Sequence, residues 1–565
     1  MDTTKGAVAG QPGGAGEGSA GDGGPGTTDE HGAITRAAGL LGVLTFASRI
    51  AGLGRDVVIG ALFGTQVAAD AFFVAFRIPN LFRRVVAEGA TSTAFVPVFT
   101  SIRVRDGARA AATAAAAVGG MAAVTLTLLV VAGMLFSDQI VSLFAPGFAA
   151  DPVKRDLTVR LTAATFPYLF LVGLAAWAMG TLHTFRRFTA PALGPVLLNL
   201  SIISIALVVA PSLEQPVYAL VAGVMVGGFL QFAVQVPSLR ACGVQLAEVV
   251  RPSHPAVGRV GMLLLPTLLG GAVYQINILV ATLLASLLPT GSVSWLWYAD
   301  RVFEFPLGII AVAIGTAALP SLAGQATAGR LDEMAASTGY ALKLVWALCI
   351  PASIGLWMLA SPIVTVLFQR GEFSAHDTAM TAWALRAYVL GLLGVASVRV
   401  LASVFYALEK PRIPVSAAVV ALVVNGLADL ALMGPTDPSA PWWGAALFAR
   451  VGDAVRLADL DHAGLALGTG IAASINAVAL LLFARRELPD LVLGPLLSSA
   501  ARHVAAAAVM AAALYAWLLA AGGPDGVGAH GELAGGLAIG LVAYGLGALA
   551  LGSPEIRRLL SSVRR

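Results

Sequence analysis

Long apolar stretches recur along almost the whole chain, and they restrict its fold more than any other feature of the sequence. Each is at least the ~20 residues that a helix needs to cross a bilayer. We count about fourteen: 37–63, 67–101, 108–136, 156–184, 189–210, 216–240, 258–288, 294–323, 335–360, 376–408, 411–434, 462–485, 499–522 and 530–552. Because 58% of the residues are hydrophobic and only 12% are charged, no soluble class fits, and we predict an all-α polytopic membrane protein.

The basic residues between these stretches predict the orientation of the chain. Loops on the side of the N-terminus hold about nineteen arginines and lysines, and loops on the other side hold about five. Cytoplasmic loops carry the excess of such residues, so both ends are predicted to be cytoplasmic. Residues 1–35 are expected to form a disordered cytoplasmic tail without an apolar run. Trp295, Trp297 and Tyr298 follow a short outer loop and are expected in an aromatic belt at the membrane surface.

Two pairs of similar segments indicate an internal repeat. The matching segments are 76–97 with 300–320 and 185–191 with 409–414, at offsets of 224 and 223 residues. The first match places Arg77 opposite Arg301. Because each half holds an even number of stretches, the halves share one orientation and are related by an axis along the membrane normal. The predicted units are an N-lobe (36–245), a C-lobe (246–490) and two further helices with a cytoplasmic end (491–565).

The first two apolar stretches are unusually rich in charge. Between Ser48 and Pro97 they carry Arg49, Arg55, Asp56, Asp70, Arg77, Arg83, Arg84 and Glu88. A charge near the bilayer centre costs about 3 kcal/mol, so it is kept where it faces protein or water. A position at the membrane edge or in a structural ion pair explains any single arginine equally well. The arginines outnumber the nearby acids, however, and the group as a whole indicates a wet, positively biased cavity.

Three later stretches add polar groups. Asp300, Arg301 and Glu304 lie at the start of 294–323, and the last two are one helical turn apart. Asn425 and Asp429 share one face of 411–434, which fits either half of a cation site or a buried acid bonded to a neighbouring helix.

Arg386 and Arg399 belong to the stretch 376–408. Their positions leave open whether they line the cavity or end at its rim.

Several classes of protein are excluded by missing motifs. The chain has no phosphate-binding loop of the G-x-x-x-x-G-K-[ST] type, so it encodes no ATP-driven pump. Its histidines form no H-E-x-x-H pair, and its two cysteines predict no disulfide framework. Basic loops without interleaved aromatic residues predict no nucleic-acid partner. A membrane-embedded enzyme acting on polyprenyl phosphates would need a convergent acid, base or metal constellation, which the sequence lacks, so we predict that the protein is not an enzyme.

Five segments together resemble the MurJ (MviN-type) lipid II flippase family of the multidrug/oligosaccharidyl-lipid/polysaccharide (MOP) exporter superfamily. They are SRIAGLGRD (48–56), DAFFVAFRIPNLFRRVVAEGA (70–90), RFTAPALGPVLLN (187–199), GSVSWLWYADRVFEFPLG (291–308) and FYALEKPRIP (405–414). The resemblance implies fourteen helices, two six-helix lobes and alternating access. It also implies a substrate, lipid II, which is a polyprenyl-pyrophosphate-linked disaccharide peptide. This precursor would move to the outer leaflet of a bacterial plasma membrane for cell-wall synthesis, among membrane lipids and with cell-wall or division proteins as further partners.

The same resemblance implies roles for individual residues. The family's cavity arginines match Arg49, Arg55, Arg83 and Arg301, its acids match Asp70, Glu88 and Glu304, and Asn80 lies on a matched motif position. With the other charged groups, the predicted substrate site comprises Arg49, Arg55, Arg77, Asn80, Arg83 and Arg301, and its cavity acids are Asp56, Asp70, Glu88 and Glu304. Some members hold a sodium ion, and Asn425 and Asp429 match part of that site. Ala281 stands where the family often has an acid, and no other cofactor is expected.

The chemistry of arginine agrees with this substrate. A pyrophosphate presents forked acceptors, which the guanidinium group meets with two parallel hydrogen bonds while staying charged. Without an ATP motif, transport must be driven by an ion gradient, by the membrane potential or by removal of the product. A membrane potential contributes about 2.3 kcal/mol per charge per 100 mV. The alternative is another transporter of the superfamily, either a polysaccharide-lipid flippase or a drug/cation antiporter. A cation antiporter would need acidic and aromatic cavity groups instead of arginines.

Overall fold

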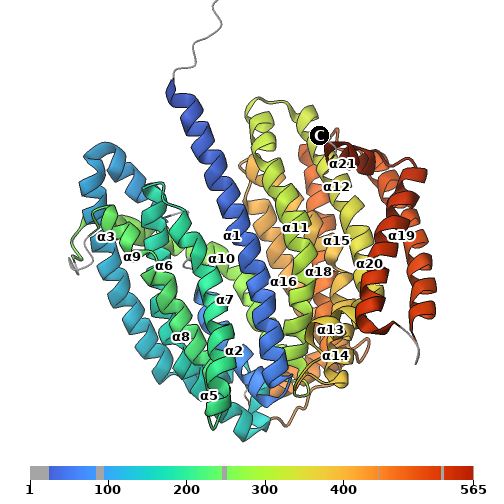
Figure 1. The fold of residues 1–565 in the computed structure, drawn as a ribbon, viewed down its shortest axis with the longest axis horizontal. Coiled ribbons are helices and arrows are strands. Elements are labelled where there is room, and N and C mark those ends of the chain that lie inside the picture. Colours follow the sequence, from blue (N-terminus) through green and yellow to red (C-terminus); the bar gives the residue numbers. More distant parts are fainter. Residues whose placement is uncertain (1–24, 84–93, 245–250, 443, 523–526, 564–565) are drawn as a thin grey trace, which may run out of the picture.

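Helices make up nearly all of the computed structural model, which describes residues 25–83, 94–244, 251–442, 444–522 and 527–563 (Figure 1). The N-terminal half contains α1 (Pro25–Phe63), α2 (Val67–Arg83), α3 (Val96–Leu135), α4 (Ser137–Phe144), η2 (Pro146–Ala150), α5 (Pro152–Thr165), α6 (Pro167–Thr184), α7 (Thr189–Val209), η3 (Ala210–Ser212), α8 (Tyr218–Ala233) and α9 (Val236–Ala241). The C-terminal half contains α10 (Pro255–Ser286), α11 (Ser292–Thr327), α12 (Leu331–Met358), α13 (Ala360–Phe368), α14 (Ala375–Val389), α15 (Leu392–Ala407), α16 (Arg412–Leu432), α17 (Ala445–Val455), α18 (Asp461–Glu487), α19 (Leu493–Ala521), α20 (Gly528–Ala550) and α21 (Pro554–Val563).

The apolar helices confirm a multi-pass membrane protein. Within the described ranges, 10 helical stretches are long and apolar enough to cross a membrane. The number rises to 11 if α14 and α15, which meet at 43°, form one bent span. Three expected spans, α1, α2 and α10, fall outside this set, and α2 has only 17 residues. The count of fourteen therefore stays a prediction.

The start of α1 differs from the sequence prediction, and an interruption within α3 agrees with it. Helix α1 begins at Pro25, so residues 25–35, which were expected in the disordered tail, are helical. Proline is favoured in the first turn of a helix because its missing N–H needs no partner there. Helix α3 is interrupted at Gly107, whose φ of 88° is a left-handed conformation that glycine tolerates. This interruption falls where the sequence predicts the break between the second and third apolar stretches.

The two halves of the chain lie side by side, with α1 between them (Figure 1). In the N-terminal half α1 packs against α7, α2 against α5, and α3 against α6. In the C-terminal half α18 packs against α15 and α16, while α19 and α20 pair beside α12 and α13. The start of α1 and the C-terminal helix α21 lie at the same end of the bundle (Figure 1). The exact lobe boundaries stay a prediction.

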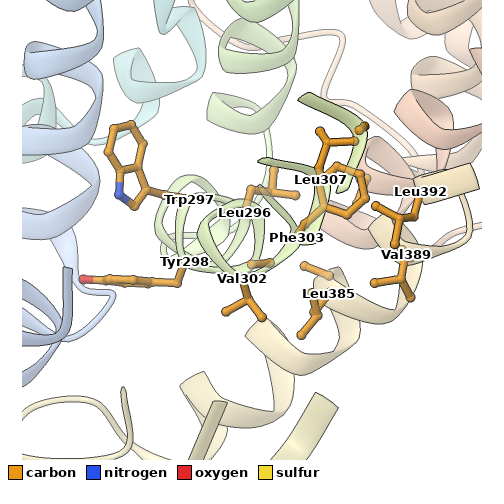
Figure 2. Packing of buried hydrophobic residues seen from close by; sticks show 14 of the residues in the cluster. Leu296, Trp297, Tyr298, Val302, Phe303, Leu307, Leu385, Val389 and Leu392 are labelled. Atoms are coloured by element: carbon orange, nitrogen blue, oxygen red, sulfur yellow. The ribbon is translucent and has the colours of Figure 1, made fainter. Parts of the chain in front are cut away.

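Helix α11 lies at the centre of the largest hydrophobic core. It packs against α12, α14 and α15 of its own half and against α2 of the other half. Figure 2 shows its apolar side chains meeting those of α14 and α15: Leu296, Val302, Phe303 and Leu307 with Leu385, Val389 and Leu392. Trp295, Trp297 and Tyr298 are 6%, 5% and 0% exposed. The expected aromatic belt is therefore wrong for these residues, because surrounding helices enclose the first turns of α11.

The two halves are joined where α1 turns into α2, at the end of the bundle remote from α21 (Figure 1). Gly64 has a φ of 56° and lies against the backbone of Glu372 in the α13–α14 loop. The amide of Glu372 donates to the carbonyl of Ala61 at 2.9 Å. The hydroxyl of Tyr298 donates to the carbonyl of Gly64 at 3.3 Å, and Thr65 donates to Asp377. We call this set of contacts, 61–65 with 370–377, the elbow junction.

Candidate functional site

Two adjoining cavities lie between the halves. The first has a volume of about 460 Å³ and is lined by α1, α7 and α11, with Phe76 and Asn80 of α2 and single residues from α8 and α15. The second has about 500 Å³ and extends among α2, α10, α11, α15, α16 and α18. They share the lining residues Asn80, Trp297, Arg301, Glu304, Leu307 and Arg399. We call the first the arginine cavity, because Arg49, Arg55, Arg301 and Arg399 line it.

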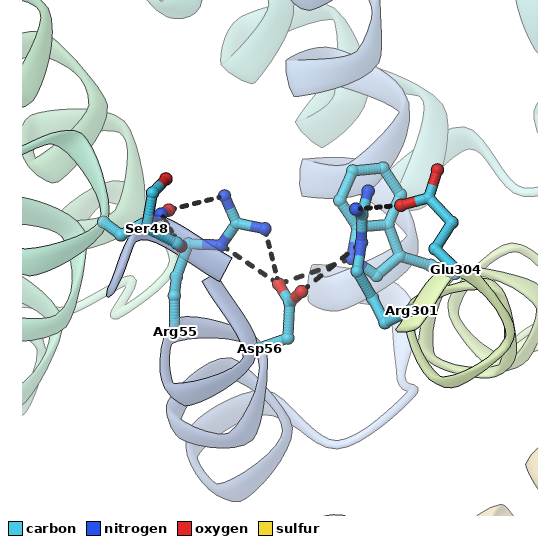
Figure 3. Close-up of polar contacts among 7 residues, drawn as sticks. Ser48, Arg55, Asp56, Arg301 and Glu304 are labelled. Atoms are coloured by element: carbon cyan, nitrogen blue, oxygen red, sulfur yellow. Dashed lines mark hydrogen bonds and ion pairs between the residues drawn. The ribbon is translucent and has the colours of Figure 1, made fainter. Parts of the chain in front are cut away.

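Asp56 is the centre of the charged cluster. Its Oδ1 atom accepts hydrogen bonds from Nε and Nη2 of Arg55 at 3.0 and 2.8 Å. Its Oδ2 atom lies 3.4 Å from Nε of Arg301, across the boundary between the halves. Figure 3 shows the carboxylate between the two guanidinium groups. Asp56 is completely buried, so this pairing keeps both arginines beside the cavity at a place where no other described acid reaches them both.

Asn199 on α7 fixes the orientation of Arg55. The Nη1 atom of Arg55 donates to Oδ1 of Asn199 at 3.1 Å. The amide nitrogen of Asn199 in turn donates to the carbonyl of Ser48 at 3.2 Å. Asn199 was not predicted as a site residue, although it ends one of the segments that carry the family resemblance. A lone carboxamide in an otherwise apolar stretch is the signal that could have identified it.

Trp297 lies beside two arginines from different halves. The guanidinium carbon of Arg301 is 4.7 Å from the centre of its indole ring, and that of Arg77 is 5.4 Å away. Phe73 stacks on the same ring at 4.6 Å between centres. An aromatic face attracts a cation by about 0.5–2 kcal/mol. Trp297 therefore lets two like charges approach one region of the site.

Arg49 and Arg399 differ from Arg55 and Arg301 because neither forms an ion pair with a described carboxylate. Both side chains are exposed, and both line the arginine cavity. The guanidinium group of Arg49 lies directly over Gly308 of α11, in the space that a β-carbon would occupy there. The structure thus settles the position of Arg399, which the sequence left open. Arg386 instead donates to Ser361 Oγ at 2.9 Å and lines neither cavity.

The balance of charge around the two cavities is positive. Five arginines line them, namely Arg49, Arg55, Arg77, Arg301 and Arg399. The lining acids are Asp56, Asp300 and Glu304. Glu304 accepts a hydrogen bond from Arg301 at 3.0 Å, as the one-turn spacing predicts. Five positive and three negative groups leave an excess of two formal positive charges, which suits an anion.

Two further predicted site residues, Arg77 and Asn80, also line the cavities. Arg77 lines the second cavity and donates to Thr282 Oγ1 at 2.6 Å, and Asn80 lines both cavities. Arg83 is the last residue of α2, and its side chain lies outside the described part of the structure. Glu88 also lies outside the described residues.

Asp70, expected as a cavity acid, lines neither cavity. It is 1% exposed and accepts hydrogen bonds from the backbone amides of Gly291 and Ser294 at the start of α11, at 2.8 and 3.0 Å. The hydroxyl of Ser294 and the buried ammonium of Lys154 donate to it at 2.6 and 2.7 Å. A carboxylate at a helix N-terminus is stabilised by the unpaired amides there. Asp70 therefore joins α2 to α11 instead of facing a ligand.

The residues at the expected sodium site do not assemble a cage of oxygens. Asn425 lines the second cavity and donates to Asn277 Oδ1 at 2.8 Å. Asp429 is completely buried, faces Gly468 of α18 and lines neither cavity. No group of three potential acidic, histidine or cysteine ligands occurs among the described residues. With Ala281 at the expected position of an acid, the site fits a sodium ion poorly, and we assign no transport step to one.

Comparisons with known proteins agree on one family. The family model for the lipid II flippase MurJ matches residues 59–440. The chain is 36% identical over 447 residues to the lipid II flippase MurJ of Burkholderia cenocepacia, covering 78% of this chain and 82% of that protein. It is 38% identical over 397 residues to the probable lipid II flippase MurJ of Vibrio cholerae, covering 68% and 75%.

Solved structures agree on the fold. A lipid II flippase MurJ in an inward closed conformation matches with a TM-score of 0.73 and 24% identity, over 92% of this chain and 99% of that one. A multidrug resistance MATE family transporter of the MOP superfamily, in an inward-facing conformation, matches with a TM-score of 0.63 and 14% identity, over 79% and 95%. These two structures show that the chain shares their all-helical fold.

Proposed function

The chain belongs to the family of the lipid II flippase MurJ, and from this premise we propose that it moves lipid II from the inner to the outer leaflet of a bacterial plasma membrane by alternating access. The observation that carries the proposal is the excess of two positive charges in cavities between the halves. A diphosphate linked to a lipid is the part of this substrate that needs such a site. Arginine pairs with it through two parallel hydrogen bonds and does not lose its charge.

The individual arginines have different tasks in this proposal. Arg49 and Arg399 have no described acid partner, so they meet the diphosphate first. Arg55 and Arg301 are held by Asp56 and Glu304, and they exchange part of that pairing for the ligand. Arg77, Asn80 and Arg83 remain proposed contacts, and Glu88 a proposed cavity acid.

Alternating access needs contacts that can break between the halves. The elbow junction and the bonds of Asp70 to α11 close one end of the molecule. We propose that this end faces the outside, with both termini in the cytoplasm. Substrate binding favours the other state by as much as its affinity differs between the two. Cysteine labelling of Thr290 from outside and of Arg187 from inside tests this orientation, and labelling from the opposite sides would reverse it.

The drive in this proposal is electrical. The cavity carries its excess positive charge when empty, and each charge that moves across the field contributes about 2.3 kcal/mol per 100 mV. The protein acts as a transporter and not as an enzyme, and a sodium ion is not required. An antiporter for cationic drugs is not favoured, because arginines repel such a substrate. Partners among the cell-wall synthesis or division proteins remain a prediction.

Flipping of fluorescent lipid II in proteoliposomes tests the proposed function. A membrane-impermeant reductant bleaches the label only in the outer leaflet, so the bleached fraction reports transport. Arg49→Ala and Arg301→Ala should each slow flipping by about 10- to 100-fold, because a hydrogen bond to a charged group contributes about 1.5–3 kcal/mol. Arg105→Ala, at an exposed arginine paired with Asp106, is the matched control and should be silent. Wild-type rates in an inserted Arg49→Ala/Arg301→Ala variant would overturn the proposal.

A further inference from the structure

Helix α17 is too short to cross a membrane. It has 11 residues, and a span needs about 20. It belongs to the connection between α16 and α18. At the start of α18, Nε2 of His462 lies 2.9 Å from the carbonyl oxygen of Met380, and Met380 is on α14, which begins in the elbow junction. Helix α17 therefore lies near the end of the bundle that the elbow junction closes.

The side chains of α17 fall on three sides of the helix. Successive residues turn by about 100°, so Ala445, Ala449 and Gly452 share one side, and all three are buried. A β-carbon at Gly452 would lie 3.9 Å from the carbonyl oxygen of Leu430, so this side of small residues packs against α16. The second side is apolar and the third is polar. The apolar side, which we call the apolar strip, is formed by Leu447, Phe448, Val451 and Val455, and the polar side by Arg450 and Asp453.

The apolar strip and its flanks expose large hydrophobic side chains. Leu447 is 59% exposed, and the other residues of the strip are half-buried. Trp442 packs against Phe448 at 5.2 Å between ring centres and extends the strip beyond the start of the helix. Leu457, just past its other end, is 82% exposed. A group of exposed apolar side chains of this kind marks a surface that binds a partner or a membrane.

Helix α16, on which α17 packs, has one side toward the second cavity and an apolar side facing outward. The cavity side includes Ala418, Ala421 and Asn425. The outward side, which is nearly opposite on the helix, is exposed and includes Val420, Val423 and Leu427. A membrane span that is apolar on the side away from its cavity meets the acyl chains of the bilayer with that side.

The lipid-facing side of α16 continues onto the connection that holds α17. Leu427 is followed one turn later by Ala431. The carbonyl oxygen of Ala431 accepts hydrogen bonds from the amides of Leu457 and Ala458 at 2.8 and 3.2 Å. The exposed Leu457 is thus held where the lipid-facing side of α16 ends. A membrane that covers Leu427 therefore reaches Leu457 and the helix that precedes it.

We infer that α17 is an interfacial helix, which lies along the outer surface of the membrane with the apolar strip at the boundary between headgroups and acyl chains. Its three sides then face protein, lipid and water. Helices of this kind bury an apolar side in the interface and keep a polar side in water. Trp442 fits this position, because tryptophan is enriched where a membrane meets water. The outer leaflet follows from the orientation proposed above, whereas the contact with a membrane depends neither on that orientation nor on the substrate.

The charge of the connection indicates how the lipid surface is bound. Residues 434–461 contain four aspartates and two arginines, so they do not attract anionic headgroups. Arg456, one of the two arginines, pairs with Asp453. The contact therefore comes from burial of apolar surface. It should persist in zwitterionic lipid and at high salt, which screens exposed charges.

Nitroxide labels on single cysteines test the inference in the full-length chain, with one copy in each phosphatidylcholine nanodisc. The native Cys242 and Cys349 are replaced first. Power saturation measures the exposure of each label to oxygen, which concentrates among acyl chains, and to a water-soluble nickel chelate. The oxygen-to-nickel ratio at Leu447→Cys and Val451→Cys should be several-fold higher than at Arg450→Cys, the matched control on the polar side of the same helix.

Two further labels calibrate the ratio, Val423→Cys for lipid and the exposed Ser439→Cys for water. Ratios at Leu447 and Val451 as low as that at Ser439 would overturn the inference. Immobilised labels that neither reagent reaches would also overturn it, because protein would then cover the apolar strip. A high ratio that required phosphatidylglycerol and fell at high salt would replace apolar contact by attraction between charges. These measurements use no lipid II, so their outcome is independent of the proposed function.

Discussion

Replacing Asp70 by Asn should open the end of the molecule that the elbow junction closes. Asp70 lies on α2, and three of its hydrogen bonds come from Gly291 and Ser294 at the start of α11, so they cross between the halves. The fourth comes from Lys154 of α5, in the same half. An amide in place of the carboxylate keeps the shape of the side chain but loses its charge. The bonds between the halves weaken, while a buried ammonium loses its partner.

The size of the effect follows from these bonds. A hydrogen bond to a charged group contributes about 1.5–3 kcal/mol, and bonds without the charge are about half as strong. Three weakened bonds, which are not fully additive, should shift the equilibrium between the closed and the open state by about 2–4 kcal/mol. That range is about 30- to 1000-fold in the equilibrium constant. Separately, a buried charge without its partner costs about 3–5 kcal/mol of stability in both states.

A second variant separates the two effects. Asp70→Asn/Lys154→Met removes the unpaired ammonium, so it should recover thermal stability while keeping the shifted equilibrium. Spin labels at Glu214 and Ser439, in exposed connections of the two halves, report the opening as a longer distance in pulsed electron resonance. The native Cys242 and Cys349 are replaced in all samples. Distance distributions identical to wild type in both variants would refute the reasoning, whatever the change in melting temperature.

Three shorter predictions concern the cavities. Gly308→Ala places a methyl group where the Arg49 guanidinium lies, so binding of undecaprenyl pyrophosphate should weaken about fivefold; Gly324→Ala, with open space around it, is the control. Arg399→Gln should weaken the binding of undecaprenyl pyrophosphate about tenfold. If the affinity of this variant fell with salt as steeply as that of wild type, Arg399 would make no ionic contact with the diphosphate. Asp429→Asn should lower the flipping rate less than about threefold, because it removes a single carboxylate from a site that lacks a second acid. If flipping by wild type strictly required sodium and this requirement disappeared in the variant, the conclusion that sodium is not needed would be wrong.

Much of the fold follows from the sequence because a bilayer imposes simple rules. Length and hydropathy identify helices such as α7, α16 and α20 to within a few residues, since each must present about twenty apolar residues. The break at Gly107 was also predicted, because charged residues end the apolar stretch before it. The start of α1 was missed because residues 25–35 are polar, and hydropathy does not detect a helix that continues beyond the apolar stretch.

The candidate site was harder to predict than the helices. Charge led to the prediction that Arg49, Arg55 and Arg301 face a cavity, because buried charges need water or partners. All three line one in the structure, and their contact with a substrate stays a prediction. Charge alone could not distinguish Asp56, which pairs with those arginines, from Asp70, which binds the start of α11. That distinction depends on which helices pack together, and the sequence pattern contains no such contact. Trp297 shows the same limit, since an aromatic residue near a helix start suits a membrane surface and a protein core equally well.

Asp56→Asn provides the sharpest test of how the arginines are used. The carboxylate of Asp56 competes with a diphosphate for Arg55 and Arg301, since it lies within 2.8 and 3.4 Å of their nitrogen atoms. Removing its charge raises the excess in the cavities from two to three positive charges. Binding of undecaprenyl pyrophosphate should therefore tighten by about tenfold or more, because a unit charge about 4 Å away contributes a few kcal/mol at an effective dielectric constant of about 20.

Tighter binding should not speed transport. Tighter binding stabilises the bound state before transport, and it speeds transport only if the same interaction also stabilises the transition state for flipping. Flipping should therefore slow although the affinity rises. Equilibrium binding and flipping rates on the same Asp56→Asn preparation check both halves of the prediction, with the exposed Asp106→Asn as the control. Weaker binding by Asp56→Asn would mean that Asp56 acts by orienting Arg55 and Arg301. In that event the proposed competition between the Asp56 carboxylate and the diphosphate would have to be abandoned.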